Sequence, residues 1–176
     1  MATGEKFIPL EGFEARTGEE MLERSKAFLE MMKKRRTVRD FASTPVPREV
    51  IENAIRTAGR APSGANKQPW HFAVIADSAA KKKLREAAEA EEREFYGGRA
   101  TGEGVGDLEP FGTDASKPFL ETAPYLIAVF RENYGIDAQT GERTNNYYVH
   151  ESAGLAAGFL IAALHNAGLA TLTHTP

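Results

Sequence analysis

A chain of 176 residues, of which 41% are hydrophobic, is long enough to bury one hydrophobic core but short for two. Its 22 Lys and Arg residues against 25 Asp and Glu give a net charge of -3, so no excess of positive charge favours nucleic acid or an anionic membrane as a partner. The absence of cysteine excludes disulfides, a thiolate nucleophile and a cysteine-ligated zinc site. We therefore expect one domain that acts on small molecules.

Neither the start of the chain nor its longest apolar run predicts targeting or membrane insertion. Residues 1–13 lack the apolar core of a signal peptide, and the longest uncharged apolar run, residues 152–164, is too short to cross a bilayer. We therefore expect a soluble protein of the cytoplasm.

The first part of the chain predicts two helices and a strand. Thr17 and Glu20 form a capping box ahead of apolar residues at helical spacing, and that helix ends in a basic patch. Pro47 begins a second helix, which Gly59 ends. After a polar loop, residues 71–75 are short, β-rich and bounded by turn-forming residues, which predicts a strand.

The rest of the chain alternates helices with strands. We expect, in order, a charged helix, a glycine-rich excursion, a strand, an Ala- and Gly-rich helix and a last strand, at residues 78–95, 97–112, 124–130, 146–166 and 169–174. The excursion lacks apolar periodicity, so we interpret it as part of a lid. Small residues on the Ala- and Gly-rich helix allow another helix, from the same chain or from a second subunit, to approach closely, and we expect a homodimer.

Two polar segments are candidates for binding a cofactor. Arg35, Arg36, Thr37 and Arg39 place three guanidiniums and a hydroxyl within five residues, and arginine suits bidentate phosphate binding. By itself this segment also fits cations that complement a helix C-terminus. The loop at residues 61–70 carries hydroxyl, amide and ammonium groups and leads into a buried strand, so it can hydrogen-bond the edge of a flavin.

Together these segments resemble the paired signatures of the nitroreductase superfamily, an Arg-Arg-Ser/Thr-x-Arg segment and a later Ala-Pro-Ser segment that runs to Gln-Pro-Trp. The resemblance implies an α+β fold with a mainly antiparallel central sheet flanked by helices, in a homodimer that binds FMN at the subunit interface. In this family the first segment holds the FMN phosphate and part of the ring system. The implied FMN contacts in the two segments are Arg35, Arg36, Thr37, Val38, Arg39, Pro62 and Ser63.

The resemblance also implies a division of the chain. Residues 1–34 would be an N-terminal extension with the first helix, and residues 35–176 the FMN-binding domain, with its lid at about residues 90–118. Family members continue with a basic residue that reaches the FMN phosphate, a last strand and a tail that wraps onto the partner subunit. We therefore expect the C-terminal part of the family fold to be missing from this sequence.

Within the superfamily, the charged helix and the lid resemble the iodotyrosine deiodinase branch. Glu92 and Tyr96 share one helical face, and Lys117 follows the excursion. In that branch the corresponding residues close over a halotyrosine, and the backbone near Ala65 approaches its phenolate oxygen. We call Glu92, Tyr96 and Lys117 the amino-acid clamp, with Glu92 pairing with the α-ammonium and Lys117 with the α-carboxylate. As an alternative, Glu91, Glu92 and Glu94 are simply a solvated helix face.

The end of the chain, residues 171–176, resembles the deiodinase pattern in which hydroxyls meet the flavin. A hydroxyl that donates to flavin N5 favours stepwise one-electron chemistry over hydride transfer. Thr175 is the predicted donor, Thr173 is the second choice, and His174 between them is a further cofactor contact. As an alternative, alternating threonines are ordinary residues of an edge strand.

The resemblance thus predicts an FMN-dependent oxidoreductase that dehalogenates halotyrosines such as iodotyrosine, with NAD(P)H or a reductase as electron donor. A general NAD(P)H-dependent nitroreductase or quinone reductase, independent of Glu92 and Lys117, is the first alternative. A non-catalytic flavin-binding domain is the second. No metal site is expected, because His150 and Glu151 lack the second histidine of a zinc protease motif.

Overall fold

The computed structural model describes residues 9–95, 97 and 109–174. The chain divides into two units, residues 1–35 and 36–176. The described part of the first unit contains helix α1 (Gly18–Met32). The side chain of Thr17 accepts the backbone N–H of Glu20, and the carboxylate of Glu20 accepts the backbone N–H of Thr17. The predicted capping box therefore begins this helix, because it satisfies N–H groups that lack partners within the helix.

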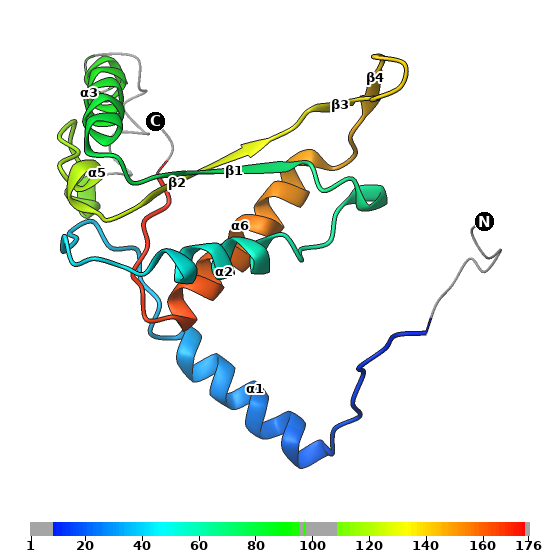
Figure 1. Ribbon diagram of the computed structural model, residues 1–176. Coiled ribbons are helices and arrows are strands. Elements are labelled where there is room, and N and C mark those ends of the chain that lie inside the picture. Colours follow the sequence, from blue (N-terminus) through cyan, green and yellow to red (C-terminus); the bar gives the residue numbers. More distant parts are fainter. Residues whose placement is uncertain (1–8, 96, 98–108, 175–176) are drawn as a thin grey trace. The chain divides into compact units, whose positions relative to one another are not determined.

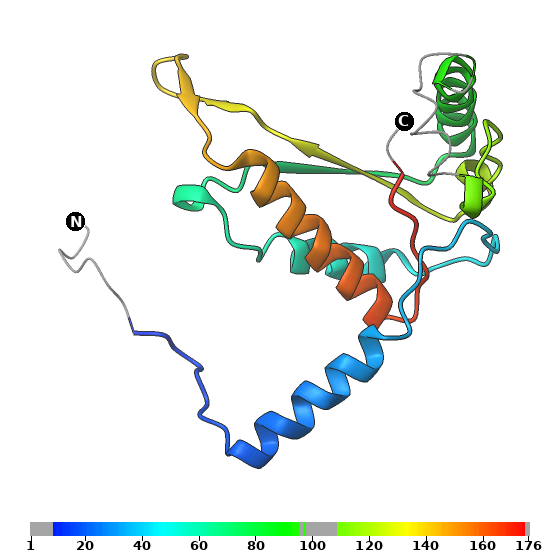
Figure 2. The same cartoon turned by 180° about the vertical axis from the view of Figure 1, so that it is seen from behind.

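The second unit combines helices with two small antiparallel sheets. Its elements in chain order are α2 (Arg48–Ala58), η1 (Gly64–Asn66), β1 (Trp70–Ile75), α3 (Ser78–Glu94), η3 (Glu109–Phe111), α5 (Phe119–Thr122), β2 (Leu126–Arg131), β3 (Tyr134–Ile136), β4 (Arg143–Asn145) and α6 (Val149–Asn166). Strand β1 pairs with β2 and β3 pairs with β4, both antiparallel. Helices α3 and α5 lie at one end of the β1–β2 ribbon, and the β3–β4 hairpin lies at the other (Figures 1 and 2).

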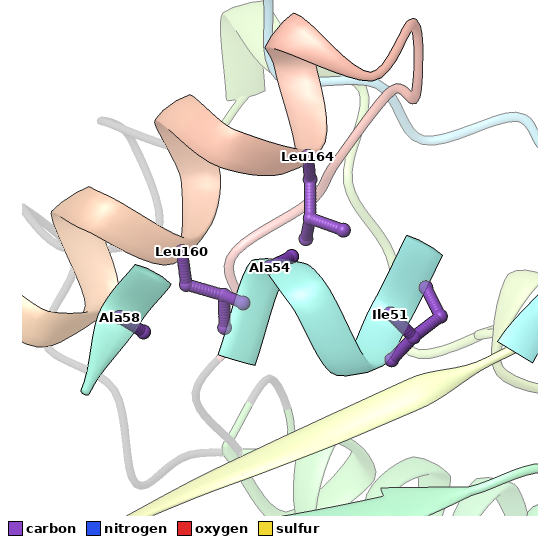
Figure 3. Close-up of a cluster of buried hydrophobic side chains, with 5 residues drawn as sticks. All are labelled: Ile51, Ala54, Ala58, Leu160 and Leu164. Atoms are coloured by element: carbon purple, nitrogen blue, oxygen red, sulfur yellow. The ribbon is translucent and has the colours of Figure 1, made fainter. Parts of the chain in front are cut away.

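The hydrophobic core lies where α2 meets α6. Ile51, Ala54 and Ala58 recur at helical spacing on α2 and face Leu160 and Leu164 of α6 (Figure 3). The two alanines let the helix axes approach closely. Phe72 of β1 and Ile127 of β2 pack against the same cluster, so the sheet is part of this core. The core thereby anchors the loop that follows α2 and the segment that follows α6.

Most elements expected from the sequence are present. Helices α1, α2 and α3 and strands β1 and β2 are confirmed, and α6 begins at Val149 rather than at residue 146. The expected antiparallel pairing is also confirmed, but as two-stranded sheets in the described ranges rather than one larger central sheet. Of the helices in these ranges, none has both the length and the apolar character needed to cross a membrane.

The strand predicted at residues 169–174 is wrong. This segment makes an isolated parallel bridge between Thr37 and Thr171, in which the backbone N–H of Val38 donates to the carbonyl oxygen of Thr171 at 3.2 Å. Alternating threonines favour an extended backbone, but a strand also needs a partner that continues the ladder of hydrogen bonds. The bridge supplies one such contact, which is enough to bring the two segments together.

The β3–β4 hairpin was not predicted, although its turn has a readable signal. The side chain of Asp137 accepts the backbone N–H groups of Gln139 and Thr140, and Gly141 has a φ of 73°. An aspartate that folds back on the following backbone, with a glycine in the left-handed region, is typical of a turn. The hairpin delivers the chain to Tyr147 and Tyr148 at the start of α6.

Candidate active site

Residues 36–39 and the end of the described chain lie side by side. The Thr37–Thr171 bridge joins two stretches that are both predicted to contact the cofactor. Arg36, Thr37 and Arg39 are exposed there. The guanidinium of Arg39 lies over the ring of Phe111, 5.6 Å from its centroid, a cation–π geometry. The backbone that carries these guanidinium and hydroxyl donors therefore lies beside the segment that carries Thr173.

Several predicted cofactor residues have local backbone roles. Val38 supplies the N–H of the bridge. Arg35 ends the N-terminal unit, where its backbone N–H donates to the carbonyl oxygen of Met32 at 3.1 Å. Two other predicted site residues, Tyr96 of the amino-acid clamp and Thr175 at the flavin, lie outside the described residues.

The loop between α2 and β1 is unusually strained. Ala65, Asn66 and Gln68 have φ values of 50°, 53° and 50°. Each non-glycine residue in the left-handed region costs about 1–2 kcal/mol, and such strain gathers at functional sites. The hydroxyl of Ser63 accepts the backbone N–H of Gln68 at 2.9 Å and so closes the loop. Pro62 and Ala65 are exposed on this loop, whereas Pro69 is fully buried at its end.

The start of α6 holds this loop in place. A Cβ on Gly64 would lie 2.8 Å from the carbonyl oxygen of Tyr147 and 3.0 Å from Cδ2 of Tyr148. Tyr148 itself has a φ of 50°. The backbone of Gly64 approaches closer than any other residue would permit, and the surrounding contacts stabilise the strained conformations on both sides.

Glu92 lies at the centre of a charged cluster. Its Oε1 is 3.3 Å from Nζ of Lys117 and 3.2 Å from Nε2 of His174. The side chains of Lys117 and Glu92 are 7% and 14% exposed. The ring of His174 also meets Phe119 edge-on, with the centroids 5.9 Å apart. The structure thus brings two predicted substrate residues, far apart in the sequence, to a predicted cofactor residue.

The pairing of Lys117 with Glu92 restricts which ligand can bind there. The ammonium of Lys117 also donates to the carbonyl oxygen of Asp114 at 2.6 Å. Leaving one partner of a largely buried ion pair without the other costs about 3–5 kcal/mol. A ligand that separates these two side chains must therefore bring one charge of each sign. A zwitterion such as an amino acid exchanges one ion pair for two.

Further polar contacts along α3 support this cluster. Glu89 accepts Nε of Arg85 and the backbone N–H of Lys117, each at 2.7 Å. The guanidinium of Arg85 and the Lys117 N–H hold the pKa of the Glu89 carboxyl below its usual range. Lys81, which is buried, donates to the carbonyl oxygens of Glu121 and Ala123, each at 2.9 Å.

Sequence reasoning missed this supporting set. Lys81, Arg85 and Glu89 recur every four residues on α3, so they share a face with Glu92. That spacing was visible in the sequence. Their partners Lys117, Glu121 and Ala123 could not be recognised from the sequence, because they lie far along the chain, on the segment before β2.

Comparison with known proteins places this chain in a family. The nitroreductase family model matches residues 32–174, and the chain belongs to that family. It is 55% identical over 170 residues to the iodotyrosine deiodinase of Haliscomenobacter hydrossis, covering 97% of this chain and 76% of that protein. It is 47% identical over 178 residues to the iodotyrosine deiodinase of Nematostella vectensis, covering 99% of this chain and 67% of that protein.

A solved structure of oxidized iodotyrosine deiodinase, bound to FMN and 3-iodo-L-tyrosine, has a similar fold. Its TM-score is 0.73 at 35% sequence identity, and the match covers 85% of this chain and 74% of that one. The family predicted from the arginine-rich and Ala-Pro-Ser segments is therefore confirmed, and so is the deiodinase branch predicted from the charged helix, the lid and the end of the chain.

Proposed function

We propose that this protein is an FMN-dependent oxidoreductase that reductively dehalogenates halotyrosines such as iodotyrosine. The observation that carries the proposal is the largely buried Glu92–Lys117 pair beside His174, which is built to accept a zwitterion. Relatives named iodotyrosine deiodinase, 47% and 55% identical, support this proposal. So does the similar structure that holds FMN and 3-iodo-L-tyrosine.

The residues of this chain fit FMN. Arg36, Thr37 and Arg39 offer exposed guanidinium and hydroxyl donors, a set suited to a phosphate. The Thr37–Thr171 bridge holds them next to Thr173 and His174. When bound in its reduced form, FMN would supply two electrons which, together with a proton, replace the carbon–halogen bond with a carbon–hydrogen bond and release halide. We propose that Thr175, with Thr173 as the second choice, donates to flavin N5.

The amino-acid clamp orients the substrate. We propose that Glu92 receives the α-ammonium and Lys117 the α-carboxylate, so both buried charges stay paired after they separate. Binding energy from the amino-acid part, remote from the reacting carbon, then holds the ring for reaction. The backbone near Ala65 is proposed to approach the phenolate oxygen, and NAD(P)H or a reductase to supply the electrons.

These assignments favour a homodimer. The strained loop at residues 63–68 and the Glu92 cluster lie at opposite ends of β1 (Figure 1). Six strand residues span roughly 17–20 Å, which is too long for one tyrosine-sized ligand to bridge. A second copy would bring its own loop to this cluster and so complete the site.

The exposed face of α6 is suited to such a contact. Leu155 and Phe159 are 46% and 40% exposed, and next to them Gly154 and Gly158 leave space for a second helix. We expect the FMN-loaded protein to sediment as a dimer. Phe159→Asp should shift it to monomer and reduce retention of FMN by at least about tenfold, because a charge in an apolar interface is costly. A wild-type monomer that retains FMN would contradict this prediction.

The proposed activity is tested by titrating the FMN-loaded protein with 3-iodotyrosine. Flavin fluorescence reports binding, and iodide release under dithionite reports turnover. We expect both responses, whereas an iodophenol without the zwitterion should cause little quenching at the same concentration. Bound flavin with neither response would refute the deiodinase proposal and favour a general nitroreductase or quinone reductase. Failure to bind FMN would refute the proposed cofactor site.

A further inference from the structure

We propose that Glu89 is a positioning residue that holds Lys117 in place for the amino-acid part of the substrate. This inference rests on the proposed function, because it assigns a role within the same clamp. Glu89 Oε1 accepts the backbone N–H of Lys117 at 2.7 Å, across 28 residues of sequence. The contact therefore ties α3 to the segment that carries Lys117.

Lys117 requires such support because of where it lies. It precedes α5 in a segment without regular secondary structure; its carbonyl oxygen accepts the backbone N–H of Leu120 in α5 at 3.1 Å, and its own N–H is held by Glu89. A lysine ammonium is a compact charge on a flexible stem, and its position depends on the backbone that carries it. The contact with Glu89 holds that backbone, while Glu92 and the carbonyl oxygen of Asp114 hold the ammonium.

Glu89 is itself held and kept charged. Arg85, one turn earlier on α3, donates Nε to Oε1 of Glu89 at 2.7 Å and reaches Glu121 at 3.2 Å. Its guanidinium, with the Lys117 N–H, holds the pKa of Glu89 below its usual range. The acceptor is therefore ionised at neutral pH, and hydrogen bonds to charged groups are the stronger ones.

The geometry separates this role from direct substrate binding. The Oε1 atom of Glu89 is engaged by Arg85 and by the backbone of Lys117, not by the Lys117 ammonium. Glu89 precedes Glu92 by one helical turn on α3. The helix that provides one charge of the clamp thus also holds the backbone that provides the other.

The test compares Glu89→Ala with Glu89→Gln in the FMN-loaded full chain. We measure the Kd of 3-iodotyrosine by flavin fluorescence, KM and kcat for iodide release, nitroarene reduction and the thermal midpoint. Glu89→Ala should raise Kd and KM about tenfold, the loss expected for one charged hydrogen bond. Because the reacting groups are untouched, kcat and nitroarene reduction should stay within about twofold. Glu89→Gln keeps an acceptor oxygen and should recover most of the affinity.

Glu121→Gln is the matched control. It weakens the other carboxylate partner of Arg85 but leaves the Lys117 N–H with its acceptor, so its Kd should match that of the wild type. Glu89→Leu, of similar volume, makes the same test if the alanine variant does not fold.

Unchanged Kd in folded Glu89→Ala, or equal damage from Gln and Ala, would overturn the inference. A parallel loss of nitroarene reduction would also overturn it, since that marks a general structural role. Failure of the wild type to bind 3-iodotyrosine would instead overturn the proposed function.

Discussion

Glu92→Gln is expected to abolish measurable binding and deiodination of 3-iodotyrosine while leaving nitroarene reduction largely intact. The substitution removes the partner of the α-ammonium, so in the complex this charge would be largely buried beside a neutral amide, because the side chain at position 92 is only 14% exposed. An uncompensated buried charge costs about 3–5 kcal/mol, which corresponds to a loss of affinity of roughly 100-fold to several thousand-fold. Nitroarenes carry no zwitterion, so their reduction does not depend on this pair.

The measurement is the Kd of 3-iodotyrosine by flavin fluorescence, alongside steady-state reduction of a nitroarene. Glu86→Gln is the control, because Glu86 lies on the same helix with a side chain that is 64% exposed. It should leave both properties unchanged, since exposed ion pairs contribute little. Equal loss of both activities in Glu92→Gln would disprove the clamp.

Gly64→Ala is expected to weaken FMN retention by at least about tenfold and to lower the thermal midpoint. The new Cβ would lie 2.8 Å from the carbonyl oxygen of Tyr147, so backbone must shift to accommodate it. Overpacking of this kind costs about 1–3 kcal/mol. The shift would fall on a loop in which Ala65, Asn66 and Gln68 already have positive φ, and it would displace Ser63, a predicted FMN contact.

Retained FMN after gel filtration and the thermal midpoint test this prediction. Gly59→Ala is the matched control, because the φ of Gly59 is -65° and its added Cβ would make ordinary contacts at 3.5 and 3.6 Å. It should be neutral or slightly stabilising, since alanine restricts the unfolded chain. Wild-type flavin content and stability in Gly64→Ala would show that the close approach to α6 does not support the site.

The amino-acid sequence by itself predicted the helices α1, α2, α3 and α6, the first two strands and the family. The capping box at Thr17 and Glu20 and the spacing of Ile51, Ala54 and Ala58 act between near neighbours, so they are readable without a fold. Residue chemistry also indicated Glu92 and Lys117 as members of one clamp, because a carboxylate and an ammonium suit a zwitterion, but their contact with each other was not predicted. The arginine-rich segment and the Ala-Pro-Ser loop were sufficient to indicate the family, which the comparisons confirm.

Only the tertiary structure decided how these parts meet. It placed His174 against Glu92 and the carboxylate of Glu89 within hydrogen-bond distance of the backbone N–H of Lys117. It also placed Thr171 in a bridge with Thr37, where a strand was predicted. Each of these contacts joins residues far apart in sequence, and none has a local pattern that would predict it. Such contacts form because the packing of α2, α6 and the sheet determines where the ends of the elements lie, and that packing is a property of the whole chain.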